Sequence, residues 1–176
     1  MSEDRVGDST VAEVKDASEI RRGLMGRRAA LVVLLVVVLA GATGLLGVHT
    51  STARASGGGY SIALDYARVS RAGLDSPWKV TVTRADGFDG ELTLATSSTY
   101  FEMFETQGFS PEPDSETAAG GVLYQTFAPP EGATSFTVAY DAYIQPASQR
   151  GRTGRTTLIV DGREVTHVDY RTWLVP

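Results

Sequence analysis

The chain of 176 residues contains no cysteine and carries a formal net charge of −5 at neutral pH. The lack of cysteine excludes disulfides, thiolate metal sites and a cysteine nucleophile. The acidic balance argues against nucleic acid as a partner, because such binding is driven by cationic side chains.

Residues 1–28 form a polar head that is too short to bury a core of its own. Apolar residues recur at helical spacing from Val11 to Leu24, which fits a juxtamembrane amphipathic helix. The alternative is a tail without stable structure, because short isolated helices are marginal in water. We favour the second interpretation.

Residues 29–48 contain no charged side chain. A helix crosses a bilayer core of ~30 Å with about 20 apolar residues, so this stretch predicts a transmembrane helix. Four arginines, at positions 21, 22, 27 and 28, precede the stretch, whereas Arg54 alone follows it closely. The positive-inside rule then predicts a single-pass protein of the cell membrane, with a cytoplasmic N-terminus and an extracytoplasmic C-terminal domain.

A signal peptide is the alternative interpretation of the same stretch. Two Ala-x-Ala patterns, at 40–42 and 53–55, match a cleavage site. However, the charge-free run is longer than the apolar region of about 7–15 residues that is typical of a signal peptide. We therefore expect a retained anchor, while cleavage would give a secreted protein.

Residues 49–59 end in three glycines and are predicted to be a flexible linker. Residues 60–176 show apolar side chains at alternate positions in short runs, separated by turn-forming residues. About seven such runs without a long helical pattern indicate an all-β, immunoglobulin-like antiparallel β-sandwich. The predicted strands cover residues 60–70, 78–84, 91–97, 121–127, 134–144, 156–160 and 164–174.

The segment 78–94, WKVTVTRADGFDGELTL, is similar to a strand–turn–strand unit of bacterial surface immunoglobulin-like domains. In that unit an alternating valine strand meets a GF-x-G turn. The whole chain also resembles small single-span actinobacterial membrane proteins of uncharacterised function with one such outward domain. The resemblance implies an immunoglobulin-like sandwich, and it implies no activity and no catalytic residues.

Residues 100–109 are unusually rich in aromatic side chains, and their spacing of three predicts a short helical turn. Exposed clusters of this kind mark partner sites, and their rings also stack on sugars such as those of a cell-wall glycan. The alternative is that the segment caps one end of the core. The candidate binding residues are Tyr100, Phe101, Met103, Phe104 and Phe109.

Glu112, Asp114 and Glu116 place three carboxylates at alternate positions of one loop. Calcium takes about six to eight oxygen ligands in flexible geometry, so these residues form a candidate metal site. Their spacing lacks the EF-hand pattern, and an exposed loop without a ligand is the alternative. The arginine-rich loop 149–155 could meet lipid phosphates or acidic groups, or could simply connect two strands.

The two histidines, His49 and His167, are far apart in the sequence, and no serine lies in a G-x-S-x-G motif. These residues predict neither a zinc site nor an activated nucleophile. A pair of catalytic carboxylates needs no local motif, so a carboxylate-dependent hydrolase stays open as an alternative.

Together these features predict a non-catalytic, membrane-anchored interaction domain of the cell envelope. Its expected partners are the lipid bilayer and another envelope protein or a second copy of itself, with no cofactor and no nucleic acid. The alternatives are a module that binds calcium or wall glycan and, as a third candidate, the hydrolase.

Overall fold

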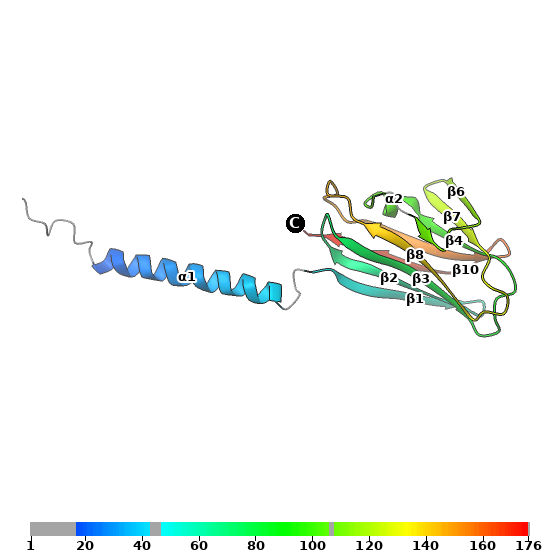
Figure 1. The fold of residues 1–176 in the computed structure, drawn as a ribbon, viewed down its shortest axis with the longest axis horizontal. Coiled ribbons are helices and arrows are strands. Elements are labelled where there is room, and N and C mark those ends of the chain that lie inside the picture. Colours follow the sequence, from blue (N-terminus) through cyan, green and yellow to red (C-terminus); the bar gives the residue numbers. More distant parts are fainter. Residues whose placement is uncertain (1–16, 43–46, 106–107, 176) are drawn as a thin grey trace, which may run out of the picture. The chain divides into compact units, whose positions relative to one another are not determined.

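The structure, a computed structural model, describes residues 17–42, 47–105 and 108–175. The chain divides into two compact units, Met1–Leu46 and Gly47–Pro176, which are treated separately. In its described part, the first unit is one helix, and the second consists mainly of β-strands (Figure 1).

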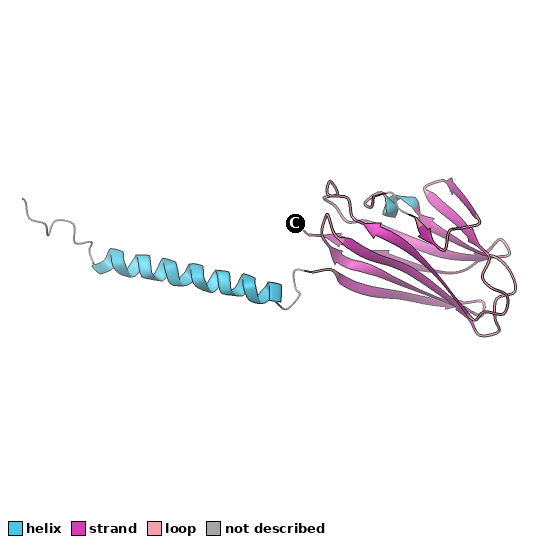
Figure 2. Cartoon of the chain, viewed as in Figure 1, coloured by secondary structure: helices cyan, strands magenta, loops and turns pink. Residues whose placement is uncertain are grey.

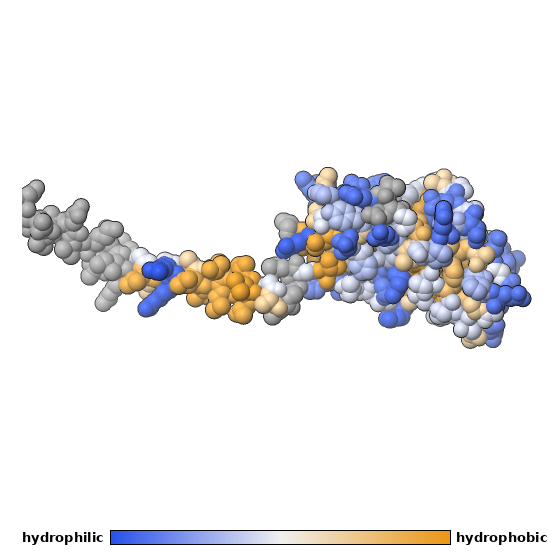
Figure 3. Space-filling model, in the orientation of Figure 1, coloured by the Kyte–Doolittle hydropathy of each residue, from blue (hydrophilic) through white to orange (hydrophobic). Residues whose placement is uncertain are grey.

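The helix α1 covers Ala17–Ala42, and its segment Gly23–Ala42 is long and apolar enough to cross a membrane. The large apolar side chains of this segment are exposed (Figure 3). A signal sequence near an N-terminus has the same length and composition. The helix therefore agrees with the predicted membrane anchor, and it agrees equally with a cleaved signal peptide.

The bounds of α1 differ from the predicted span of 29–48. Residues 17–28, assigned to the polar head, are helical because arginine, leucine, methionine and alanine extend a helix that the apolar segment nucleates. Residues 1–16 of the predicted head and 43–46 of the predicted span lie outside the described residues.

The predicted linker, residues 49–59, is instead a β-strand and its turn. Strand β1, His49–Gly57, pairs antiparallel with β2, Tyr60–Ser70, along its whole length. Gly58 and Gly59, which suggested flexibility, have φ of 57° and 81° and form the tight turn between the two strands. Since only glycine enters this conformation at little cost, the same residues mark a hairpin.

The second unit contains two antiparallel sheets, with one parallel addition at β11 (Figure 2). The order is β1-β2-β3-β8-β5 in the first sheet and β10-β9-β4-β7-β6 in the second, while β11 pairs with β2. Besides β1 and β2, the first sheet contains β3 Asp75–Arg84, β5 Phe109–Ser110, β8 Ser135–Tyr143 and β11 Trp173–Leu174. The second contains β4 Leu92–Ser97, β6 Ser115–Ala119, β7 Val122–Phe127, β9 Thr153–Val160 and β10 Arg163–Arg171.

The all-β prediction is confirmed, but the described residues form eleven strands and not about seven. Three of the extra strands, β1, β5 and β6, lack the apolar alternation on which the prediction depended, and the fourth arises because the predicted strand 164–174 is divided into β10 and β11. Strand β6, for example, is exposed at all five positions. Such strands lie at or near sheet edges, where hydrogen bonding to one neighbour replaces burial as the reason for their extended form.

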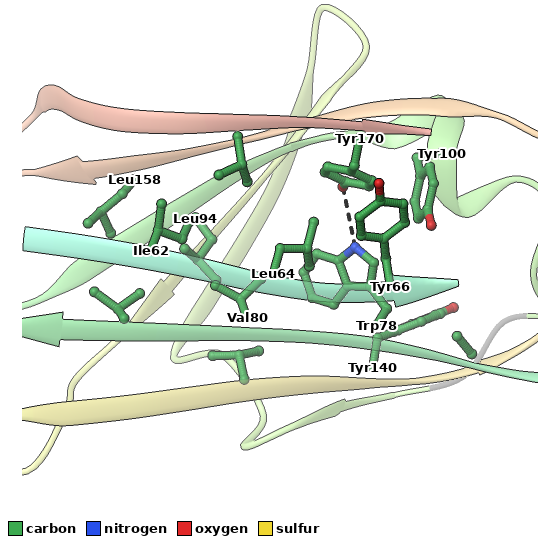
Figure 4. Packing of buried hydrophobic residues seen from close by; sticks show 14 of the residues in the cluster. Ile62, Leu64, Tyr66, Trp78, Val80, Leu94, Tyr100, Tyr140, Leu158 and Tyr170 are labelled. Atoms are coloured by element: carbon green, nitrogen blue, oxygen red, sulfur yellow. Dashed lines mark hydrogen bonds between the residues drawn. The ribbon is translucent and has the colours of Figure 1, made fainter. Parts of the chain in front are cut away.

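Side chains from both sheets form one core (Figure 4). Ile62 and Leu64 of the first sheet face Leu94 and Leu158 of the second, and all four are at most 1% exposed. A polar link also joins the sheets near one end of this core. There the indole N–H of Trp78 on β3 donates to the hydroxyl of Tyr170 on β10 at 3.3 Å.

Candidate functional site

The aromatic segment leaves β4 as the one-turn helix α2, Ser98–Phe101, so the predicted helical turn is confirmed. Tyr100, Met103 and Phe104 are 0%, 1% and 3% exposed and belong to the core. For these three residues the structure agrees with the core-capping alternative. Phe101 and Phe109 are only half-buried and pack against the core from outside.

Tyr100 holds the segment in place through a buried hydrogen-bond chain. The Thr172 hydroxyl donates to the Ala67 carbonyl at 2.6 Å, so the Tyr100 hydroxyl donates to Thr172, at 2.8 Å. Burial raises the pKa of Tyr100 far above its usual value, and burial likewise raises the pKa of Tyr170 to about 12. Both phenols are therefore neutral at physiological pH and have a structural role.

Phe101 and Phe109 form an aromatic wall together with Tyr140 of β8. Their ring centroids lie 5.0 Å and 4.6 Å from that of Tyr140. Both rings also contact Trp78 edge-on, at 5.2 Å and 5.9 Å. Because Trp78 is 1% exposed, the wall rests directly on the core and has little freedom to collapse.

The three carboxylates of the acidic loop do not converge. Asp114 accepts a hydrogen bond from the Ala128 backbone N–H at 2.8 Å, and Glu116 accepts one from the Gln125 side-chain amide at 2.8 Å. Among the described residues, no group of three or more His, Asp or Glu side chains is placed to hold a metal ion. The geometry thus gives no support to the calcium interpretation of Glu112, Asp114 and Glu116.

The aromatic wall and the acidic loop instead border one groove of about 760 Å³. Its aromatic side is formed by Phe101, Phe104, Phe109 and Tyr140. The charged residues among its described lining are all glutamates, namely Glu102, Glu112 and Glu116. The aromatic segment 100–109 and the acidic loop 112–116, which two residues separate in the sequence, therefore border a single site.

The glutamates of the groove differ in how firmly they are held. Glu102 forms an ion pair with Arg152 at 3.1 Å, in which both side chains are about half exposed. The Glu116 carboxylate is oriented by Gln125, whose side chain is fully buried. An oriented carboxylate beside apolar ring faces can accept a hydrogen bond from an ammonium or guanidinium group whose hydrocarbon stem covers the rings.

Sequence reasoning did not assign Tyr140, Leu123 and Gln145 to this groove. Tyr140 belongs to a strand with alternating apolar residues and was expected in the core. Its ring centroid indeed lies 5.9 Å from that of the buried Phe104. Gln145 follows β8 and donates through its side-chain amide to the Phe104 carbonyl at 2.6 Å. No local sequence pattern identifies these residues as part of the groove, because their position there depends on which strands lie next to one another in the folded domain.

The remaining histidine candidate lies elsewhere on the surface. His167 is exposed on β10, and its Nδ1 lies 2.9 Å from a Glu164 carboxylate oxygen. Its Nε2 is 4.0 Å from an Asp169 carboxylate oxygen, and Asp169 is engaged by Arg155 through two hydrogen bonds of 2.7 Å and 3.1 Å. These contacts describe a surface ion-pair network without a nucleophile.

Comparison of the chain with models of known protein families gives no match, and comparison with curated proteins gives none either.

Proposed function

We propose that the chain is a non-catalytic, membrane-anchored protein that presents an immunoglobulin-like sandwich outside the membrane as a recognition module of the cell envelope. Its groove would bind an extended segment of another envelope protein that carries an apolar side chain next to a basic one. The observation that carries this proposal is the meeting of the aromatic wall with three glutamates in one groove.

The aromatic wall supports binding of an apolar side chain. Phe101 and Phe109 keep part of their surface accessible, although both pack on Trp78. Rigid aromatic surface beside a pocket is what binding hot spots commonly use, because little conformational entropy is lost when it is covered. A flexible, solvent-exposed loop would give no such advantage.

The charge of the groove supports a basic partner. Glu112 and Glu116 are solvent-exposed, so a ligand cation can reach them without a large desolvation penalty, whereas Glu102 is exposed but already paired with Arg152. Exposed carboxylates of one sign steer an oppositely charged partner and select against an acidic one. For the same reason they lack the apolar burial that a general acid of a hydrolase requires, which makes catalysis the weaker alternative.

Two sheet edges supply backbone groups for an extended segment. Strand β6 is the last strand of the second sheet, and the two-residue β5 is the last of the first. Glu116 of β6 and Phe109 of β5 both line the groove. Addition of a peptide strand to a free sheet edge is a recurrent mode of recognition, with side-chain pockets providing the specificity.

The position of β1 argues against processing at the second Ala-x-Ala pattern, whereas cleavage at 40–42 would leave β1 intact. Cleavage after the Ala-x-Ala pattern at 53–55 would remove most of a strand that pairs with β2 along its length. It would also uncover Ile62 and Leu64, because Ala53 and Ala55 pair with them and pack against the core. Processing at this position would therefore damage the domain that it releases.

A second candidate ligand is a wall glycan, favoured by the combination of ring faces with carboxylates and the amide of Gln145 in the same groove. Sugar rings stack their C–H faces on aromatic side chains, and carboxylates accept hydrogen bonds from hydroxyls. This ligand needs no cation, so charge distinguishes it from a basic peptide.

Peptide binding to the full-length protein in zwitterionic nanodiscs tests the proposal by fluorescence anisotropy. The probe is a short labelled peptide with one phenylalanine between two lysines, and its matched control carries glutamates in place of the lysines. We expect the lysine peptide to bind and the glutamate peptide not to bind. Glu112→Gln with Glu116→Gln should weaken binding about tenfold, since a charge-assisted contact contributes about 1.5–3 kcal/mol when fully formed and less when exposed.

The control variant is Glu131→Gln, which removes an exposed carboxylate from the opposite end of the domain. It should leave peptide binding unchanged, and empty nanodiscs should bind no peptide. Equal binding of the two peptides would contradict the proposal. Binding of a soluble peptidoglycan fragment, with neither peptide bound, would replace it with the glycan alternative.

A further inference from the structure

The strands of the domain run between two ends, and β1 begins at one of them with His49. Val69 of β2 pairs with both His49 and Trp173, so the last strand, β11, lies at the same end. The loop 144–152 is there as well, because the Thr172 N–H donates to the Arg152 carbonyl at 2.9 Å. We call this the tether end, and it comprises His49, residues 68–74, 98–105, 144–152 and 171–175.

The two ends carry opposite charge. The connections at the far end, residues 58–59, 85–91, 128–134 and 161–162, contain five acidic residues and no basic one, and one of the five, Asp89, is paired with the adjacent Arg84. The tether end contains five arginines, at positions 68, 71, 150, 152 and 171, against Glu102, Glu105 and the adjacent Asp75. Of these acids, Glu102 is already paired with Arg152. A domain that is acidic as a whole thus concentrates its positive charge where the chain enters it.

Exposed apolar side chains gather at the tether end too. Among the described residues of this unit, four large apolar side chains are exposed, and Leu74, Trp173 and Val175 are three of them. Trp173 is 50% exposed, and the guanidinium of Arg171 stacks over its ring at 3.5 Å from the centroid. Trp173 and Val175 border a shallow hollow together with Arg68 and His49.

The chain itself limits what can meet this end. Residues 43–48 connect Ala42, the last residue of α1, to His49, the first of β1, and these seven residue steps span at most about 25 Å. If α1 is the anchor, His49 at the tether end stays within that distance of the end of the anchor. Tryptophan is enriched in the interfacial region of membranes, and arginine forms bidentate hydrogen bonds with phosphate.

We propose that the tether end, through Trp173, Arg171 and Arg68, docks on anionic lipid headgroups. Trp173 and Val175 enter the headgroup layer, while the two arginines bind lipid phosphates beside them. The acidic far end is repelled by the same surface, so docking orients the domain with that end away from the membrane. This inference depends on the anchor and not on the ligand of the groove, so either proposal can fail alone.

Quenching of tryptophan fluorescence by brominated lipid tests the docking. The full-length protein is reconstituted into vesicles of phosphatidylcholine with about one third phosphatidylglycerol, and into vesicles of phosphatidylcholine alone. The chain has two tryptophans, of which Trp78 is buried, so Trp173→Phe defines the background. We expect strong quenching from Trp173 in the anionic vesicles and little in the zwitterionic ones or at high salt.

The double variant Arg68→Gln, Arg171→Gln should lower the ratio of docked to undocked protein about 25-fold. Each arginine near an anionic surface contributes a factor of about five, or ~1 kcal/mol. The matched control is Arg163→Gln, an exposed arginine beside the far end, which should leave quenching unchanged. Thermal melting of each variant checks that the fold is retained.

Quenching that is equal in both vesicle types, absent in the anionic vesicles, or equally sensitive to Arg163→Gln would overturn the inference. Quenching that falls as the number of protein molecules per vesicle rises at a fixed lipid composition would also overturn it, because a second copy of the chain would then cover Trp173 and shield it from the lipid.

Discussion

Single residues of the segment 100–109 differ sharply in what surrounds them. Phe104 is 3% exposed, and its ring centroid lies 5.6 Å from that of Tyr100. It is therefore a core residue, and it also lines the groove. Phe109 lies on a two-residue edge strand and is half-buried. The spacing of the aromatic residues predicts the helical turn but cannot separate these two environments, since both residues are apolar and both point toward the same end of the core.

This difference predicts opposite outcomes for two alanine variants. Phe104→Ala should destabilise the domain by about 3–5 kcal/mol, as expected for removal of a buried phenylalanine. Phe109→Ala should lower the free energy of unfolding by roughly half of that amount or less, yet it should weaken binding of the lysine peptide. Urea denaturation followed by fluorescence measures the stability of each variant, and the anisotropy assay measures its affinity for the peptide. The assignment would be wrong if Phe109→Ala unfolded the domain as readily as Phe104→Ala, or if it left peptide binding intact.

At the scale of elements, the alternation of apolar residues predicts the central strands well. Strand β2 has the predicted bounds, 60–70, and the Asp161-Gly162 turn was expected from its sequence and has φ of 52° and 73°. The same reasoning misses β1, β5 and β6, whose side chains are small, polar or few, and it joins β10 and β11 into one strand. It also misses the groove, because no pattern within β5, β6 or β8 indicates that residues of these three strands line one groove.

The β1–β2 hairpin gives a direct test at this scale. Gly59 has φ of 81°, and a Cβ added there would meet no atom within 4 Å, so Gly59→Ala changes backbone strain and little else. We expect a loss of about 1–2 kcal/mol in the free energy of unfolding. The control is Gly90→Ala, which also has open space but an ordinary φ, and which should be neutral or slightly stabilising.

Chemical denaturation of both variants provides the measurement. A flexible linker at 49–59 would make the two substitutions equivalent, because an unstructured glycine carries no conformational requirement. Equal stability of Gly59→Ala and Gly90→Ala would therefore contradict the hairpin.

At the scale of the whole molecule, an apolar helix precedes a β-domain that has a groove and two oppositely charged ends. Composition and hydropathy alone predict the helix and the all-β class. The groove and the charge separation depend on strand order, which brings residues 101–116 beside Tyr140 and gathers distant arginines at one end. The groove borders the tether end, because Phe101, Glu102, Phe104 and Gln145 of its lining belong to the segments of that end.

Thiol labelling of intact cells tests most directly the claim that the groove is presented outside the membrane by a retained anchor. The chain has no cysteine, so Ser115→Cys, beside the groove, and Ser2→Cys, in the head, each carry one thiol. We predict that a membrane-impermeant maleimide labels the Ser115→Cys variant in intact cells and the Ser2→Cys variant only after permeabilisation. Both variants should stay in carbonate-washed membranes. The reverse labelling pattern, or recovery of the β-domain in the medium, would contradict the account.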